Sequence, residues 1–377
     1  MSRWEQLIKP ALREVGAYHP GPSLDQLMAR HGLQAVDKLN WNEGLWGPLP
    51  GVLDAAAGAL HQAWAYPEHA YDTLREAIGR ETGAPPEQVL PGHGIQALIL
   101  TLVNAFVSPG DRVVIPAPTY GLYAQACRVA GAHVERVASP ALALDLEAIA
   151  AAVGRTGARI VWICDPNNPT GLRLGAGEWR AFLDAVGDDC LVVVDEAYAD
   201  YVAPAERLRR EDDIADGRRI VVLRTFSKIF GLAGLRLGYL LGDPELVHYL
   251  HSVQEPFNVN RAALAAGVAS LGRSHDVGAR RDAAIAARER LTAALRAGGM
   301  APVPSAANFV LVDLGVDDAE LTALLLARGI LVRPGTELGL PGWARITVAP
   351  DAVMDRAAAA LLEARAALMT REAAAAS

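Results

Sequence analysis

Short runs of consecutive hydrophobic residues alternate with amphipathic segments through the middle of the chain. The Val-, Ile- and Leu-rich runs predict buried strands, and the segments between them, with apolar residues three and four positions apart, predict helices. Regular alternation of the two predicts an α/β fold with a mostly parallel central sheet sandwiched by helices. The predicted strands are 112–115, 133–137, 159–164, 191–194, 220–224 and 237–241, and the helices include 122–130, 146–153 and 178–186.

The segments on either side of this region have different patterns. Toward the N-terminus they predict helices over 23–31, capped by Ser23, then over 51–64, 71–82 and 95–107. After residue 262 they predict an alanine-rich helix to about 297, strands over 308–314, 330–333 and 345–348, helices over 317–328 and 351–369, and a frayed tail over 371–377. We therefore predict an N-terminal arm (1–45) that joins a small α+β domain (266–377), and a large domain (46–265) between them.

Composition narrows the class of protein. The chain has 377 residues, 51% of them hydrophobic, and a net charge of -8, which provides no basic surface for nucleic acid or an anionic membrane. The N-terminus lacks the apolar core of a signal peptide, and the apolar helix over 95–107 is too short to span a bilayer, so we predict a cytoplasmic enzyme. Cys127, Cys164 and Cys190 are widely spaced, which predicts buried free thiols and no metal site.

The clearest candidate chemistry follows the strand predicted over 220–224. Thr225, Ser227 and Lys228 come at its end, and Arg236 lies eight positions beyond the lysine. An amine can form a Schiff base, while hydroxyls and a guanidinium can hold a phosphate, so the cluster suits pyridoxal phosphate (PLP). A structural turn with a solvated lysine is the alternative for this stretch alone.

A carboxylate follows the strand predicted over 191–194. Asp195 could keep a pyridine nitrogen protonated, and Tyr198 could donate to the 3-oxygen of the same ring. The rival interpretation is the Walker B aspartate of a nucleotide hydrolase. That interpretation requires a G-x-x-x-x-G-K-[ST] string, which the sequence lacks.

A glycine turn, Gly92-His93-Gly94, opens the helix predicted over 95–107. The free amide groups at such a helix start favour an anion. The string also fits the dinucleotide fingerprint G-x-G-x-x-A. The acidic residue that this fingerprint requires is missing at the end of the next strand, so a cradle for a single phosphate is favoured.

Further candidates lie in other loops and late strands. Asn168 follows a strand, in a loop with a proline on each side, and could bind a ring oxygen or an acidic group of the substrate, or simply belong to a turn. Tyr120 could stack on a planar ring or simply pack. Arg333 and Arg345 could each capture a carboxylate or phosphate, or form surface ion pairs. Trp41 and Trp46 could line a pocket or pack between domains.

Five strings in a fixed order resemble the fold-type-I PLP-dependent aminotransferases, and within them the histidinol-phosphate aminotransferase family. They are Pro-Thr-Tyr (118–120), Asn-Asn-Pro-Thr-Gly (167–171), Asp-Glu-Ala-Tyr (195–198), Thr-Phe-Ser-Lys with Gly-Leu-Ala-Gly-Leu-Arg-Leu-Gly-Tyr (225–239) and Arg-Ile-Thr-Val (345–348). The resemblance implies the PLP-transferase fold of type I. It also implies transfer of an amino group between an amino acid, or an amino alcohol phosphate, and a 2-oxo acid.

The resemblance also implies roles for individual residues. Lys228 would be the Schiff-base lysine and proton shuttle, Asp195 the pyridinium partner, and Asn168 and Tyr198 the contacts of the 3-oxygen, with Tyr120 stacked on the ring. Phosphate would be bound by Arg236, Thr225, Ser227 and the amides of Gly94, Ile95 and Gln96. Tyr66 would reach the phosphate of the neighbouring subunit, which implies a homodimer with shared sites. The acidic group of the substrate would be held by Arg345, Arg333 and Tyr18, with Asn308 close by.

Two strings depart from the family pattern. Ile95-Gln96-Ala97 stands where the family has a small residue and Asp-Glu. Asn40-Trp41-Asn42-Glu43-Gly44-Leu45-Trp46 stands where it has a Ser-Asn-Glu-Asn-Pro type of string. If Trp41 and Trp46 line the site, aromatic or apolar donors should react faster than histidinol phosphate. A decarboxylase or eliminase, similar to threonine-phosphate decarboxylase, and a nonenzymatic PLP-binding module are the alternatives.

Overall fold

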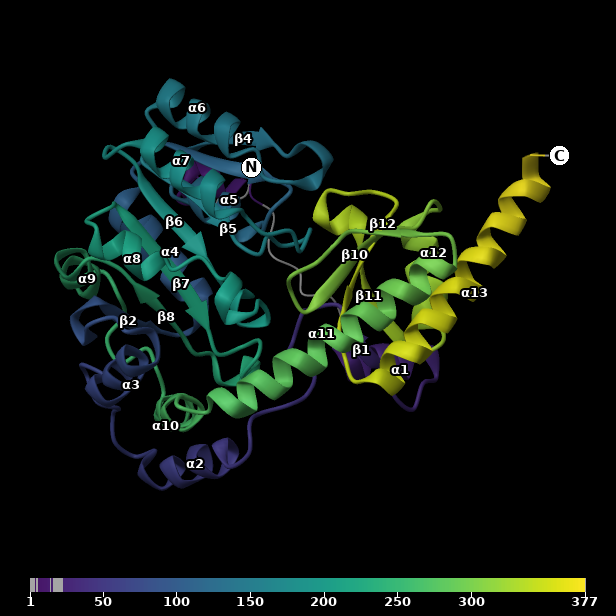
Figure 1. Cartoon of the computed structure of the whole chain (residues 1–377), viewed down its shortest axis with the longest axis horizontal. Coiled ribbons are helices and arrows are strands. Elements are labelled where there is room, and N and C mark those ends of the chain that lie inside the picture. Colours follow the sequence, from purple (N-terminus) through teal and green to yellow (C-terminus); the bar gives the residue numbers. More distant parts are fainter. Residues whose placement is uncertain (1–3, 5, 14, 16–22, 377) are drawn as a thin grey trace.

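The computed structural model describes residues 4, 6–13, 15 and 23–376, and this part of the chain forms two sheets with separate hydrophobic cores (Figure 1). The large sheet has the strand order β2-β8-β7-β6-β5-β3-β4. Its neighbours from β7 through β4 are parallel, whereas β8 is antiparallel to both β7 and β2. The predicted mostly parallel sheet is confirmed. Its strands are β2 (Val89–Gly92), β3 (Arg112–Ala117), β4 (His133–Ala138), β5 (Ile160–Cys164), β6 (Leu191–Asp195), β7 (Ile220–Thr225) and β8 (Gly238–Leu241).

Helices cover both faces of the large sheet, because its central strands are apolar on both sides. In β5, for example, Val161 and Ile163 enter one core, whereas Ile160 and Trp162 enter the other. The first core is formed with α2 (Val52–Ala59), α3 (Asp72–Thr82), α6 (Leu146–Thr156), α7 (Ala176–Val186), α8 (Arg210–Ala215) and α10 (Arg261–Ser270). The second is formed with α4 (Gly94–Phe106), α5 (Leu122–Val129) and α9 (Pro244–His251).

The small sheet combines the two ends of the chain. Its order is β1-β11-β12-β10-β9, in which β1 from the N-terminal region pairs in parallel with β11. The long helices α11 and α13 lie along it, and the C-terminal part of α13 extends past the sheet (Figure 1). The strands are β1 (Asp37–Leu39), β9 (Ala301–Pro302), β10 (Phe309–Asp313), β11 (Ile330–Pro334) and β12 (Trp343–Thr347), and the helices are α1 (Leu24–His31), α11 (Ser274–Ala297), α12 (Asp318–Leu326) and α13 (Asp351–Ala376).

Several predicted boundaries differ from the structure. The alanine-rich stretch after 262 forms two helices, because the chain turns at Gly272, whose φ is +73°. The tail expected to fray is helical through Ala376, in line with the high helix propensity of alanine. Ser23 caps α1 as predicted and forms a capping box with Gln26. The domain limits at 45 and 265 stay a prediction.

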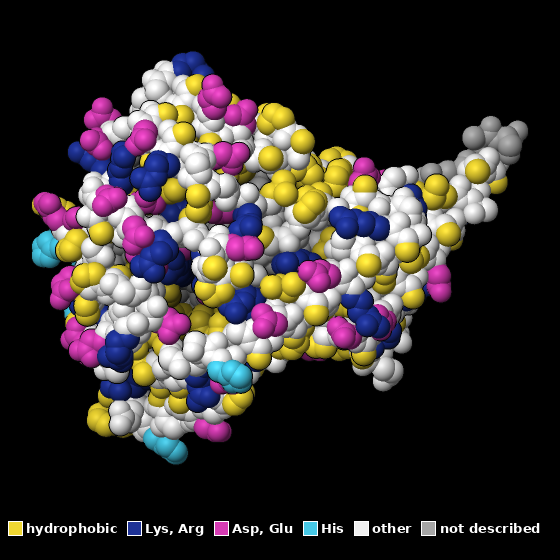
Figure 2. Space-filling view, in the orientation of Figure 1, with side chains coloured by type: hydrophobic (Ala, Val, Ile, Leu, Met, Phe, Trp, Pro, Cys, Tyr) yellow, Lys and Arg dark blue, Asp and Glu magenta, His cyan; other side chains and the backbone are white. Residues whose placement is uncertain are grey.

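The cysteines lie in the interior, and charged side chains of both signs lie on the surface. All three cysteines are buried and free, as predicted. Acidic and basic side chains are interspersed over the face shown in Figure 2. Among the helices that the structure describes, none combines the length and the apolar character needed to cross a membrane.

Candidate active site

Three neighbouring parallel strands deliver the predicted chemistry to one edge of the large sheet. Strands β5, β6 and β7 pair in register, with Cys164 opposite Asp195 and Asp195 opposite Leu223. Asp195 ends β6, Lys228 comes three residues after β7, and Asn168 comes four residues after β5. The carboxyl ends of parallel strands are the usual place for a ligand in this architecture.

Lys228 is partly buried, and its Nζ donates a hydrogen bond to the carbonyl oxygen of Trp41 at 3.2 Å. Burial, followed by the nearby Arg345 guanidinium, lowers the pKa of Lys228 to about 7. The carboxylates of Glu43 and Asp195 act in the opposite direction. A large fraction of the amine is therefore neutral near pH 7 and able to act as a nucleophile or base.

Asp195 is buried on the side of the sheet covered by α5. Its Oδ2 accepts a hydrogen bond from the Tyr123 hydroxyl at 2.6 Å, and its Oδ1 accepts one from the Ala197 amide at 3.0 Å. Burial raises the pKa of Asp195 to about 6, although the Tyr123 hydroxyl opposes the rise. Sequence analysis missed Tyr123, which lies at the start of α5, three positions after Tyr120.

The Tyr198 hydroxyl contacts Asn42, in the segment that follows β1. The hydroxyl accepts a hydrogen bond from Nδ2 of Asn42 at 3.0 Å, which leaves its own proton available to a further acceptor. Burial raises the pKa of Tyr198, so the hydroxyl stays protonated at neutral pH. Asn42 also bonds Thr347 of β12 in both directions, through its amide at 2.9 Å and its Oδ1 at 3.2 Å. Sequence analysis missed Asn42 and Thr347, because only the folded chain brings them to Tyr198.

The start of α4 forms an anion cradle. Helix geometry leaves the first amides, those of Gly94, Ile95 and Gln96, without intrahelical acceptors. Gly94 has a φ of +74°, and a Cβ atom there would lie 2.5 Å from Nη2 of Arg236. Only glycine lets the guanidinium approach the helix start this closely.

Arg236, Ser227 and Thr225 line the same cradle. Arg236 Nη1 lies 3.5 Å from the Ser227 hydroxyl oxygen, and the Ser227 amide donates to Thr225 Oγ1 at 3.0 Å. A guanidinium, two hydroxyls and a helix start are the usual partners of a phosphate.

Tyr120 lies at the border between α4 and α5. Its hydroxyl accepts a hydrogen bond from Nε2 of Gln96 at 3.0 Å, and its ring meets that of Tyr123 edge to face at 5.4 Å. The Gln96 side chain is thus hydrogen-bonded to Tyr120, while its backbone amide is one of those that open α4.

The two late arginines have different surroundings. Arg345 is buried, and its two terminal nitrogens donate to Asn168 Oδ1 at 2.5 Å and to the Asn40 carbonyl at 2.7 Å. Arg333 is its cross-strand partner on β11, but its Nε pairs with Glu337 at 2.9 Å. Arg345 is therefore hydrogen-bonded to a site residue, Asn168, whereas the neighbouring Arg333 is paired with Glu337.

The bridging segment, residues 40–47, crosses from β1 of the small sheet to Lys228. Asn308 Nδ2 donates to the carbonyls of Asn42 and Glu43, both at 3.2 Å, so Asn308 holds this segment. A Cβ atom on Gly44 would collide with the Lys228 carbonyl oxygen, which explains the glycine. Asn308 thus anchors the segment whose Trp41 carbonyl contacts Lys228, and its place beside a substrate stays a prediction.

The two tryptophans of the bridging segment have separate environments. Trp46 packs against both the large-sheet and the small-sheet cores, which matches the structural alternative. The Trp41 ring is 36% exposed, and Nζ of Lys38 lies 4.1 Å from its centre. Lys38 is in turn paired with Glu43 at 2.6 Å. Trp41 contacts Lys228 through its backbone carbonyl.

Among the described residues, Tyr66 is a predicted site residue that is not brought into this cluster. The Tyr66 ring is 77% exposed and stacks on Phe257 at 4.9 Å. Tyr18 lies outside the described residues.

Comparison with known proteins agrees with this arrangement. The family model described as "Aminotransferase class I and II" matches residues 36–361. A histidinol-phosphate aminotransferase of Symbiobacterium thermophilum is 38% identical over 90% of this chain and 94% of that protein. An aromatic amino acid aminotransferase of Nocardia farcinica is 42% identical over 88% of this chain and 91% of that protein.

A solved structure extends the likeness to three dimensions. The histidinol-phosphate aminotransferase of Sinorhizobium meliloti, determined in complex with PLP, superposes with a TM-score of 0.88 at 31% identity, covering 98% of this chain and 99% of that one. The chain belongs to the class I and II aminotransferases and is a PLP-dependent aminotransferase.

Proposed function

We propose that Lys228 is the residue that binds PLP covalently in this aminotransferase. The observation that carries the proposal is a lysine with a pKa near 7 placed between a buried carboxylate, Asp195, and an anion cradle at Arg236. PLP presents an aldehyde, a ring nitrogen and a phosphate, which match these three groups in kind. When bound, it supplies an electron sink for charge that develops on the substrate's α-carbon.

The surrounding side chains would hold the cofactor. Arg236, Ser227, Thr225 and the amides that open α4 would bind the phosphate, and Tyr120 would stack on the ring. Asp195, ionised above pH 6, would keep a proton on the ring nitrogen. Tyr198 would donate its free hydroxyl proton to the 3-oxygen, and Asn168 would donate through Nδ2, since its Oδ1 already accepts from Arg345.

Lys228 would also move the reacting proton. Once released by the incoming amine, its neutral Nζ can take a proton from the α-carbon and return it elsewhere. Arg345 would orient the donor by binding its acidic group. Arg333, after leaving Glu337, and Tyr18 would assist. The relatives named as histidinol-phosphate aminotransferases make histidinol phosphate the first donor to test.

The lysine content of the chain makes the assignment testable, because only Lys9, Lys38 and Lys228 are present. Borohydride reduction of the PLP-loaded protein followed by peptide mapping should place the label on Lys228. Lys228→Ala should lose the absorbance of bound PLP and at least about a thousandfold in turnover. Lys38→Arg serves as the control. Label on Lys9 or Lys38, or turnover by Lys228→Ala, would refute the proposal.

Aromatic amino acids are a second candidate donor class. Trp41 is partly exposed and accepts a hydrogen bond from Lys228 through its backbone carbonyl, and the Nocardia farcinica relative is named for aromatic donors. Histidinol phosphate, phenylalanine and tyrosine should each be mixed with the PLP form while conversion to pyridoxamine phosphate is followed. We expect the aromatic acids to react faster, and Trp41→Ala to slow them by up to about tenfold. Trp4→Ala is the control, and faster reaction of histidinol phosphate would remove this candidate.

We also propose a cytoplasmic homodimer with shared sites. Its support is a cluster of exposed apolar side chains on one chain segment, where Trp64 is 87% exposed and Tyr66 extends from the same turn. Tyr66 would contact the phosphate in the neighbouring subunit. Three free, buried thiols suit a reducing compartment.

A further inference from the structure

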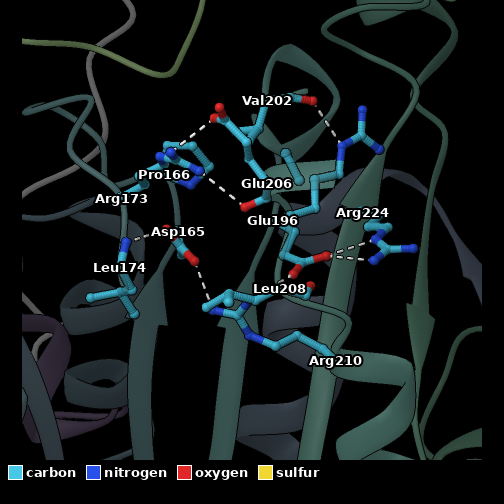
Figure 3. Close-up of a pocket in the computed structure, with 12 residues that line it drawn as sticks. Asp165, Pro166, Arg173, Leu174, Glu196, Val202, Glu206, Leu208, Arg210 and Arg224 are labelled. Carbon is cyan, nitrogen blue, oxygen red and sulfur yellow. Dashed lines mark hydrogen bonds and ion pairs between the residues drawn. The ribbon is translucent and has the colours of Figure 1, made fainter. Parts of the chain in front are cut away.

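Charged residues, most of them buried, lie together next to the ends of β5, β6 and β7; Figure 3 shows Asp165, Glu196, Arg210 and Arg224. Asp165, Glu196 and Arg224 occupy one row across β5, β6 and β7, one position beyond the paired residues Cys164, Asp195 and Leu223. The amides of Asp165 and Glu196 continue the ladder by donating to the carbonyls of Asp195 and Leu223 at 3.0 and 2.9 Å. The row is thus fixed to the same backbone as the catalytic candidates.

Helix α8 joins this row from the side. Its first residue, Arg210, donates from Nη2 to Asp165 at 2.7 Å and pairs through Nη1 with Glu196 at 3.6 Å. Glu196 also pairs with Arg224 at 2.7 Å, and Arg224 pairs with Glu211, the second residue of α8, at 2.7 Å. Carboxylates and guanidiniums therefore alternate along one connected chain of ion pairs.

This series of ion pairs lies on the face of the large sheet opposite to the Asp195 side chain. Asp195 contacts Tyr123 of α5, whereas its neighbour Glu196 contacts Arg210 of α8, because successive side chains of an extended strand point to opposite faces. The two carboxylates that Arg210 contacts are close in sequence to site residues: Glu196 follows Asp195, and Asp165 precedes Asn168 by three positions. A displaced ion pair would therefore move a site residue through a few backbone bonds.

A gain in net stability is a weak reason for an arginine at position 210. Its side chain is 1% exposed, and buried ion pairs seldom stabilise a fold more than apolar residues of the same size would. A cavity of about 20 Å³, room for about one water, lies beside it, and its Nε has no hydrogen-bond partner among the described residues. What defines its position is contact with two carboxylates and the Trp179 ring, 4.3 Å away.

We propose that Arg210 is a positioning residue for the active site. It joins Asp165 to Glu196 and thereby fixes the loop that carries Asn168 relative to the end of β6, which carries Asp195, and the turn with Tyr198 that follows. Arg210 does not touch the cofactor or substrate. The inference rests on the proposed function, because the loops matter only if they hold PLP.

The test compares Arg210→Met and Arg210→Lys with the wild-type holoenzyme. Arg365→Met is the matched control, since Arg365 bonds the carbonyls of Leu314 and Gly298 in the small-sheet part, at 2.7 and 3.2 Å. For each protein, PLP affinity of the cofactor-free form, the visible circular dichroism of bound PLP and thermal unfolding are measured. Lack of PLP binding by the wild type would count against the proposed function itself.

We expect Arg210→Met to bind PLP about tenfold more weakly and to alter the circular dichroism band of bound PLP. Arg210→Lys should bind PLP with an affinity between those of the wild type and Arg210→Met. An ammonium keeps the charge but cannot span both carboxylates as a guanidinium does. Arg365→Met should lose stability and leave both PLP readouts unchanged. If Arg210→Met does not fold, Arg210→Lys decides alone. Variants with reduced stability but wild-type PLP affinity and spectrum would show a purely structural role and overturn the inference.

Discussion

At the scale of single residues, the environment of Lys228 is the feature with the most consequences. Arg345 and burial disfavour its protonated form, and Asp195 and Glu43 favour it, with a pKa of about 7 as the balance. An ordinary lysine has a pKa near 10.4 and would be almost fully protonated at neutral pH. The fold thus prepares the amine before any ligand arrives.

The first prediction concerns pH. Because the pKa of Lys228 is lowered, the fraction of its amine that is neutral increases as pH rises through about 7. The rate at which the cofactor-free protein captures PLP should increase over the same range and then level off. Stopped-flow absorbance between about pH 5 and pH 10 measures this rate. Arg345→Gln should move the midpoint upward, because a cation that opposes protonation is lost. Arg290→Gln, on an exposed ion pair with Asp355, is the control. A midpoint near 10 in the unmodified protein would contradict the prediction.

At the scale of elements, the turn between β2 and α4 couples backbone shape to ligand binding. Gly94 both adopts a left-handed conformation and lies against the Arg236 guanidinium. Gly157, at the end of α6, shares the first property with a φ of +63° but has no neighbouring atom where a Cβ would lie. A comparison of substitutions at the two glycines therefore distinguishes the effect of backbone strain from that of a clash between a Cβ atom and Arg236.

The second prediction uses this pair. Gly94→Ala and Gly157→Ala should each lower the free energy of unfolding by about 1 kcal/mol, because alanine is strained at positive φ. Only Gly94→Ala should weaken PLP binding, by about tenfold or more, since its Cβ displaces Arg236 from the cradle. Thermal unfolding and PLP titration measure the two effects. Equal PLP affinity in both variants would argue against a phosphate cradle at α4.

At the scale of the whole molecule, the site combines both sheets. The bridging segment connects β1 of the small sheet to Lys228, and Arg345 of β12 reaches Asn168 beyond β5. Within the part of the chain that the structure describes, Tyr66 is a predicted site residue that lies at the surface, stacked on Phe257. A second copy would bring it to a site if the proposed dimer forms.

The third prediction tests this sharing. Tyr66→Ala and Lys228→Ala chains, each with low activity alone, should regain activity when they are expressed together and isolated as mixed dimers. One of the two sites in such a dimer would contain an intact Lys228 and an intact Tyr66 from opposite chains. Activity of the purified mixed dimer is compared with each parent. No gain over the Tyr66→Ala parent would mean that the site is complete within one subunit.

Local sequence patterns determined much of this protein. Continuous apolar runs gave the central strands, because buried parallel strands need apolar residues on both faces, and the end of each run located Asp195, Lys228 and Asn168. These features depend on a few neighbouring residues. The helix break at Gly272 was harder to place, because alanine-rich residues on both sides continue the same pattern.

Tertiary structure decided what the distant segments do. Nothing local marks Asn42 as the partner of Tyr198, Tyr123 as the partner of Asp195, or Arg210, within a highly charged stretch, as a buried bridge. Hydrogen bonds and ion pairs between such residues form only when packing removes them from water and brings them within reach. The sequence by itself determined the strands and the reactive groups at their ends; the packed chain determined the ionisation, orientation and support of those groups, because these depend on burial and on neighbours far away in sequence.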